Sequence, residues 1–387
     1  MTKSWQAKAR PRLCCFIVFS IFSANNLWGA RPVNLEKIDS AQLGFSVYFS
    51  SQLFLEKAQR TLIFLEDAFR KQVTLQGFTA PNTYQIYLVP TAMGGARTAQ
   101  DELGIYTVID PALDDLLWAS YIHHEWQHAC QYAMGGPSSS LFMDEASAVL
   151  QEVLAFPAAS YWLDALRDFQ SYPQVPLFSS GEGLSQLIGA STKYEYGGAL
   201  FLLFLEDKYG LKDGQLVRHL WQKREPWISA IEEVTKSSMQ NLLMDFAIWR
   251  IRAENLYGDR GALKVRRLLQ ISDSPLLIHS EEMPAQLGCF FVKHVVKNNP
   301  ISFLVSIKSK LSKLEQNERP LGIALLIIKK NQIIKSKHKN QFHSATNFTV
   351  HLQEDEEITM AICDLSVHLA FDKTTVHPIE VFLQKFS

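Results

Sequence analysis

The chain has 387 residues, of which 47% are hydrophobic and 20% charged, and its formal net charge is −1. This composition excludes an intrinsically disordered chain, and the length suits two compact domains rather than one. A net charge near zero excludes a global electrostatic field that would gather nucleic acid or an anionic membrane, so no nucleic-acid partner is expected, although local charged patches remain open.

The first thirty residues have the composition of an export signal. Four basic residues precede an apolar run from Leu13 to Phe22, which is shorter than the ~20 residues of a membrane span. An uncleaved membrane anchor is the alternative. We therefore predict a signal peptide over residues 1–30, a secreted or periplasmic protein, and no stable membrane insertion after cleavage.

The pattern that follows predicts an α+β domain over residues 31–270, mostly helical with a small β-sheet. Apolar residues three to four apart predict a helix over residues 51–72, and alternation predicts a pair of strands at 83–89 and 104–109. Gly94 and Gly95 favour a loose connection between those strands. Helical spacing then predicts helices over residues 116–133, 144–156, 196–209, 211–222 and 238–256.

The last third of the chain changes to short strand-like stretches. They cover residues 290–296, 301–307, 323–328, 348–352 and 358–363. We expect a separate β-sandwich over residues 271–387, with the boundary near 272–275. Cys289 and Cys363 both lie in such stretches and could form a disulfide in an oxidising compartment, which the sequence leaves open.

A metal-binding pattern lies within the helix predicted at 116–133, where the chain reads His124-Glu-Trp-Gln-His128. Two histidines four apart on a helix project from one face, so both imidazoles can reach one zinc ion while Glu125 addresses its water. The tryptophan and other apolar residues of this helix cluster on a different side. We expect His124 and His128 to bind zinc, with structural histidines as the alternative and His123 as a neighbour.

A catalytic zinc site needs a third protein ligand. The metzincin arrangement requires glycine and histidine where this chain has Gln131 and Met134, so that class is excluded. Glu145 lies 17 positions after His128 in a predicted helix that begins Asp-Glu-Ala. This layout resembles the gluzincins, the group that includes thermolysin, and the resemblance implies that Glu145 is the third ligand. Glu152 is the main alternative.

The resemblance extends from about residue 45 to 260. Together with the stretch from Tyr196 to Gly210, the motifs are similar to a poorly characterised family of bacterial secreted metallopeptidases, which implies a zincin-like catalytic domain followed by a β-sandwich. One departure concerns Val149, which stands where thermolysin has an aspartate four residues after the ligand glutamate. The group that orients a zinc-bound histidine must therefore differ, and Ser147, Asp144 or a backbone carbonyl are the candidates.

The resemblance implies a zinc-dependent endopeptidase that hydrolyses protein or peptide substrates, with Glu125 as general base and Tyr196 as donor to the oxyanion. Tyr194 is nearly as good a donor, and both tyrosines could instead be core residues. Two other functions stay open. One is a zinc amidase that acts on cell-wall or glycan-linked substrates, and the other is a non-catalytic zinc-containing binding protein.

The predicted C-terminal domain carries a basic segment. Its members are Lys329, Lys330, Lys335, Lys337, His338 and Lys339. A solvated hairpin is one explanation of such a run, and contact with an anionic polymer of the cell envelope through this domain is the sharper hypothesis.

Overall fold

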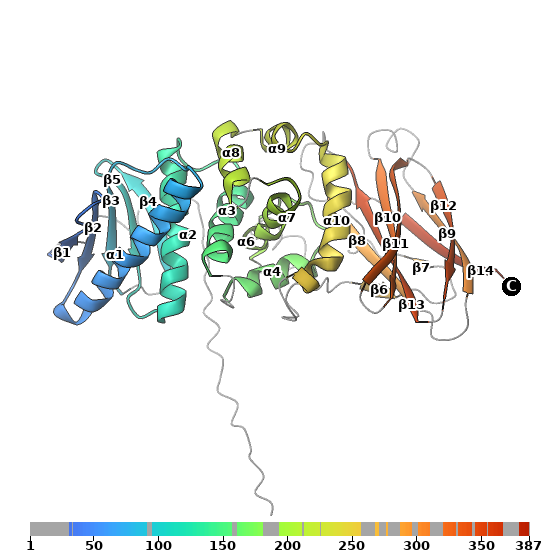
Figure 1. The fold of residues 1–387 in the computed structure, drawn as a ribbon, viewed down its shortest axis with the longest axis horizontal. Coiled ribbons are helices and arrows are strands. Elements are labelled where there is room, and N and C mark those ends of the chain that lie inside the picture. Colours follow the sequence, from blue (N-terminus) through green and yellow to red (C-terminus); the bar gives the residue numbers. More distant parts are fainter. Residues whose placement is uncertain are drawn as a thin grey trace, which may run out of the picture.

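The computed structural model describes residues 31–32, 34–90, 95–156, 161–180, 193–210, 213–224, 226–256, 268–270, 276–277, 287–295, 301–309, 320–329, 332–342, 345–353, 355–366 and 379–386. The expected signal peptide and the expected domain boundary near 272–275 lie outside these ranges. Within them, no helix combines the length and apolar character that crossing a membrane requires. The chain has the mixed α+β composition expected from sequence, with a sheet at one end, helices in the middle and two further sheets at the other end (Figure 1).

The first sheet has the strand order β1-β2-β3-β5-β4. Its strands are β1 (Glu36–Asp39), β2 (Phe45–Phe49), β3 (Tyr84–Leu88), β4 (Ala96–Asp101) and β5 (Gly104–Ile109). The predicted strands at 83–89 and 104–109 are β3 and β5, which are parallel neighbours, and β1 and β4 add antiparallel edges. The expected loose connection was wrong for residues 96–101, because they form a short polar strand whose sequence lacks the apolar alternation of the others.

Helices cover this sheet and form the middle of the molecule. They are α1 (Leu55–Phe69), α2 (Asp115–Ala133), α3 (Leu141–Ala155), α4 (Tyr161–Ser171), α6 (Tyr194–Gly197), α7 (Ala199–Tyr209), α8 (Gln215–Lys223), α9 (Trp227–Thr235) and α10 (Met239–Leu256). A 3-10 turn, Gln52–Phe54, precedes α1 and a π-helical turn, Arg70–Leu75, follows it. The helix predicted over 196–209 is divided at Gly198, and α4 and α9 were not predicted.

Helix α2 connects the sheet to the helical layer. Trp126 packs on the sheet side, with its ring 5.0 Å from Phe45 and 5.1 Å from Tyr84 between centroids. The helix stops before Gly135, whose φ of 113° suits glycine, and Ser140 caps α3 by accepting the N–H of Met143. This short connection places α2 and α3 side by side, with the opposite face of α2 turned toward α3 (Figure 1).

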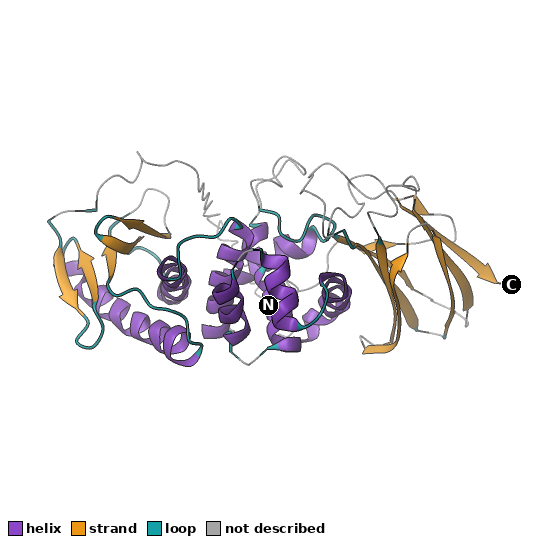
Figure 2. Ribbon diagram, turned by 90° about the horizontal axis from the view of Figure 1, so that it is seen from above, coloured by secondary structure: helices purple, strands orange, loops and turns teal. Residues whose placement is uncertain are grey.

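The C-terminal part consists of two sheets that face each other (Figure 2). The strands are β6 (Leu268–Gln270), β7 (Leu276–Leu277), β8 (Cys289–Val295), β9 (Ile301–Ser309), β10 (Leu321–Lys329), β11 (Gln332–Phe342), β12 (Ala345–Leu352), β13 (Glu356–Asp364) and β14 (Ile379–Phe386). One sheet has the order β11-β10-β13-β8-β6 and the other β12-β9-β14-β7. Buried side chains of both sheets, among them Val292, Val305 and Val381, form the core between them.

Strands β10 and β13 of the first of these sheets are buried on both faces, whereas β11 is exposed at its edge. The outward face of this sheet joins the core of the helical part, since Phe291 and Ala361 belong to the same apolar cluster as Ala247 of α10. Gly322 permits this approach, because a Cβ added there would lie 2.3 Å from the sulfur of Met244. Cys289 and Cys363, which the sequence left open, stand opposite each other on β8 and β13 and form a disulfide in this sheet.

Candidate metal centre

Helices α2 and α3 bring three side chains together. The Nε2 atoms of His124 and His128 lie 3.1 Å apart, and the Oε2 atom of Glu145 lies 3.3 Å from the first and 3.5 Å from the second. All three residues are wholly or largely buried between the helices. The residues predicted as ligands from the sequence therefore form one compact triangle of donor atoms, which His123 does not join.

The triangle has the dimensions that a tetrahedral zinc site requires. Ligand atoms at about 2.0–2.1 Å from a tetrahedral metal stand roughly 3.3 Å from one another. The three measured separations of 3.1, 3.3 and 3.5 Å bracket that value. In addition, Oε2 of Glu145 is buried without a hydrogen-bond partner among the described residues, which is costly for a carboxylate unless a cation neutralises it. The donor set therefore fits zinc.

The second nitrogen of His124 contacts a carboxylate. Its Nδ1 lies 2.6 Å from Oε1 of Glu152, and the hydroxyl of Ser120 donates to Oε2 of the same carboxylate at 2.6 Å. Glu152, the rival third ligand from sequence, thus lies on the far side of His124 from the donor triangle. The expectation that Ser147, Asp144 or a backbone carbonyl orients this histidine was wrong, because Glu152 stands two helical turns beyond Glu145 on the same face of α3.

The second nitrogen of His128 is held by an amide. Its Nδ1 lies 2.8 Å from Oε1 of Gln131, while Nε2 of Gln131 donates to the hydroxyl of Ser147 and the carbonyl oxygen of Asp144. Because the amide nitrogen of Gln131 donates to these two groups, the amide oxygen is the atom that faces His128 and accepts a hydrogen bond from its Nδ1–H. The lone pair of Nε2 is then directed toward the triangle, which is the tautomer that binds a metal.

The charges of the cluster favour a cation. Burial lowers the pKa of both His124 and His128. The carboxylate of Glu145 outweighs this effect at both residues, together with Glu152 at His124, so each pKa lies above its usual value. Burial raises the pKa of Glu145, yet the two imidazoles outweigh it and hold that pKa well below its usual range. The site therefore places a buried carboxylate against two imidazoles, so that a metal cation bound there would compete with protons.

Glu125 is fixed by the sheet rather than by the donor triangle. The hydroxyl of Thr98 on β4 donates to Oε2 of Glu125 at 2.7 Å, and Thr98 in turn contacts the hydroxyl of Thr107 on β5 at 2.5 Å. Tyr84 of β3 completes this chain through its own hydroxyl. This support was not predicted from the sequence, because Thr98 lies on β4, which was not predicted.

Of the two candidate tyrosines, Tyr196 lies in the site. Its ring stacks on His124 with 6.0 Å between centroids and 15° between planes. Tyr194 instead packs in the core, with its ring 4.7 Å from that of Phe169. Burial, and then the nearby carboxylates led by Glu145, raise the pKa of Tyr196 well above its usual value, so its phenol keeps its proton.

His123 points away from the triangle. Its Nδ1 lies 2.9 Å from the carbonyl oxygen of Ala119, and its Nε2 lies 3.1 Å from Oδ2 of Asp67 on α1. The side chain therefore joins α2 to α1, which agrees with its expected position as a neighbour of the site.

Replacement of Glu152 by glutamine is expected to weaken zinc binding by about 10- to 100-fold, because a neutral amide replaces the carboxylate that orients His124. Glu145→Gln should weaken it further, since a ligand is lost. Both affinities can be measured by competition with a chromophoric chelator. The opposite ranking would make Glu152 the direct ligand and Glu145 the orienting group.

Comparisons with known proteins supply no family for the chain. No protein-family model and no curated protein matches it. A solved pre-peptidase C-terminal domain of collagenase from Bacillus anthracis is 6% identical, covers 30% of this chain and 94% of its own, and has a TM-score of 0.20. A Cry1Da tryptic core variant from Bacillus thuringiensis is 8% identical, covers 32% of this chain and 25% of its own, and has a TM-score of 0.15. TM-scores this low carry no argument about fold or function.

Proposed function

We propose that the protein is a zinc-dependent endopeptidase of the gluzincin type. In this proposal His124, His128 and Glu145 hold the metal, Glu125 is the general base and Tyr196 is the oxyanion donor. The observation that carries it is the triangle of donor atoms with sides of 3.1, 3.3 and 3.5 Å. A zincin-like classification of the helical part and a β-sandwich classification of the C-terminal part belong to the same proposal.

Zinc held by these residues would polarise a substrate carbonyl and promote the ionisation of water. Three protein ligands suit this use, since structural zinc sites normally have four. Proton transfer and the binding of the oxyanion would be carried out by side chains of the protein.

Glu125 has the position of a proton carrier. Its Oε2 is held by Thr98, and its side chain is buried on the same helix as two of the proposed ligands. In the proposed reaction its carboxylate accepts the proton of the attacking water and then delivers that proton to the leaving amine. A non-catalytic metal site has no need of such a base, so the placement of Glu125 favours an enzyme over a binding protein.

Tyr196 suits the stabilisation of negative charge. Burial and the nearby carboxylates raise the pKa of Tyr196 above its usual value, which favours the neutral phenol that can donate its O–H. Its stacking on His124 places the ring beside the donor triangle. A fixed neutral donor there can bind the oxyanion that develops when water adds to the carbonyl.

Strand β4 favours a peptide over other amides as substrate. It lies at the edge of the first sheet as the structure describes it, and Thr98 of this strand contacts Glu125. An edge strand presents backbone N–H and C=O groups to which an extended peptide can add as a further strand. A peptide bound in this way would pass beside the proposed base.

The proposal is tested by metal analysis together with a cleavage assay on the full chain. Purified protein should contain about one zinc per chain and cleave casein. Incubation with 1,10-phenanthroline should abolish cleavage, and added zinc should restore it. Protein that folds but neither binds zinc nor cleaves casein would contradict the proposal.

A further inference from the structure

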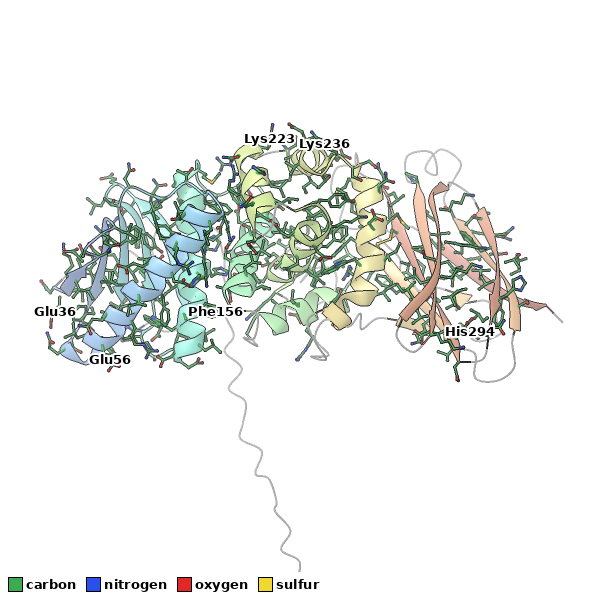
Figure 3. All side chains as sticks on the ribbon, in the orientation of Figure 1. Glu36, Glu56, Phe156, Lys223, Lys236 and His294 are labelled. Atoms are coloured by element: carbon green, nitrogen blue, oxygen red, sulfur yellow. A yellow bond between two sulfur atoms is a disulfide. The ribbon has the colours of Figure 1, made fainter. Side chains whose placement is uncertain are left out.

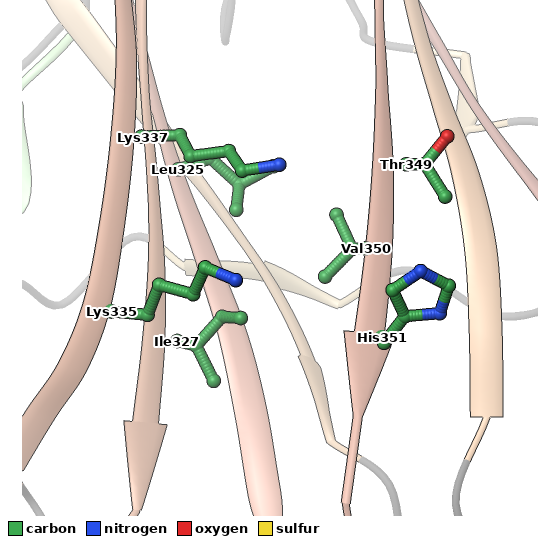
Figure 4. Close-up of a pocket in the computed structure, with 7 residues that line it drawn as sticks. All are labelled: Leu325, Ile327, Lys335, Lys337, Thr349, Val350 and His351. Carbon is green, nitrogen blue, oxygen red and sulfur yellow. The ribbon is translucent and has the colours of Figure 1, made fainter.

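A groove opens between the two C-terminal sheets, in a different part of the molecule from the metal centre (Figure 4). It lies between β11 and β12, which are the edge strands of their respective sheets. Its lining residues are Leu325, Ile327, Lys335, Lys337, Thr349, Val350 and His351. Lysine side chains extend from β11 toward β12 across this opening (Figure 4).

The lysines stand on the inner face of their sheet. In the pairing of β10 with β11, Lys335 is opposite Ile327, Lys337 is opposite Leu325 and Lys339 is opposite Ile323. Residues opposite each other in an antiparallel pair project to the same face, and these three partners are buried in the core between the sheets. The alternate residues of β11 that would continue the apolar core are therefore lysines, which remain exposed.

These lysines form a row of charge that the described residues do not neutralise. No salt bridge between Lys335, Lys337 or Lys339 and an acidic residue occurs in the described part of the chain, where Lys339 donates only to the hydroxyl of Thr346, at 3.2 Å. Alternate residues of a strand are about 6.8 Å apart, so three lysines make a row roughly 14 Å long. A linear polymer with repeated anionic groups can bind all three at once, whereas a small anion cannot.

The lining chemistry suits a polysaccharide. The cavity of about 30 Å³ holds no more than one small group, so a longer ligand must lie along the opening rather than inside it. Leu325, Ile327 and Val350 close the bottom of the opening with buried apolar side chains, so the accessible groups are the exposed lysines. Thr349 and His351 also line the opening, at exposed positions of β12 that alternate with Val350, and Nδ1 of His351 lies 2.7 Å from the hydroxyl of Ser302. The lining lacks the phenylalanine, tyrosine, tryptophan and arginine side chains on which nucleic-acid bases usually stack.

We propose that this groove binds a linear anionic polysaccharide, with Lys335, Lys337 and Lys339 as the contacts to its anionic groups. The ligand lies along the open edge, where its anionic groups contact the exposed lysines. This site is separate from the metal centre and does not depend on the proposed peptidase activity.

The test measures binding of the full-length protein to dextran sulfate, polygalacturonate and a single-stranded DNA at about 0.1 M salt. Replacement of the three lysines by glutamine should weaken binding of the preferred glycan by at least about tenfold, since three exposed ion pairs are lost. The control replaces Lys37, Lys223 and Lys236 by glutamine, which changes the net charge equally. Lys223 and Lys236 lie near α8 and α9, away from the groove (Figure 3), and the control should bind within about twofold of the unchanged protein.

Each outcome decides the proposal. Stronger binding of dextran sulfate assigns sulfate groups and stronger binding of polygalacturonate assigns carboxylates, and either supports it when only the groove variant loses affinity. Equal losses in both triple variants would show nonspecific attraction, and DNA bound more tightly than either glycan would replace the glycan by a nucleic acid. Unchanged binding with increased aggregation of the groove variant would show that the lysines only protect the edge strand from pairing. Absence of binding to all three polymers would also overturn the proposal.

Discussion

Glu125→Gln is expected to lower the rate of casein cleavage by at least about 10²-fold, the usual scale for the loss of a general base. Glutamine has nearly the same size as glutamate. Its amide oxygen can accept a hydrogen bond from the hydroxyl of Thr98, as the carboxylate of Glu125 does. Zinc content and melting temperature should therefore stay unchanged. The assay compares cleavage per zinc-containing chain, so that loss of the base is separated from loss of the metal.

The matched control is Glu56→Gln, which alters an exposed glutamate on α1 (Figure 3). Its cleavage rate should equal that of the unchanged protein. If the Glu125 variant also cleaves at the full rate, Glu125 is not the base. If neither the variant nor the unchanged protein cleaves casein or a broad peptide library while both contain zinc, a binding protein becomes the better explanation.

His128→Ala is expected to reduce zinc content from about one per chain to less than about one-tenth, because two ligands hold the ion poorly. The imidazole lost here also contacts Gln131, so the remaining ligands lose part of their support as well. Zinc is measured by elemental analysis after dialysis against a chelator, and circular dichroism shows whether the variant still folds.

His219→Ala serves as the control for this experiment, since His219 lies on α8 outside the donor triangle. It should keep its zinc. Full zinc content in a folded His128 variant would remove His128 from the site, and the donor triangle would then have no role in metal binding.

The parts of the site that are local in sequence could be predicted, and the parts that depend on packing could not. The spacing of His124 and His128 within one helix fixes their common face, so the structure places them together as predicted. Glu145 was inferred from a resemblance, and the structure places its Oε2 within 3.5 Å of both histidines. The role of Glu152 depends on how α3 lies against α2, which periodicity does not reveal.

The fold also has elements that local sequence predicts and elements that depend on packing. Most of the helices were predicted to within a few residues, but α4 and α9 were missed. Strands β4 and β11 were also missed, because polar side chains on edge strands hide the alternation. The parallel pairing of β3 and β5 could not be read either, since β4 intervenes in the chain and the pairing is set by the whole sheet. The contact of Thr98 with Glu125, the proposed base, was not predicted, because strand β4 was missed.

The sheet β11-β10-β13-β8-β6 has a consequence for how the molecule can be divided. Because its residues belong to the cores on both of its sides, a chain cut after α10 would expose the apolar surface around Met244 and Ala247 to water. Such a fragment would have an exposed apolar patch that promotes association, and α10 would lose the packing contacts that the sheet provides. The helical part and the C-terminal sheets therefore stabilise each other through this shared core, and neither is expected to keep its full stability without the other.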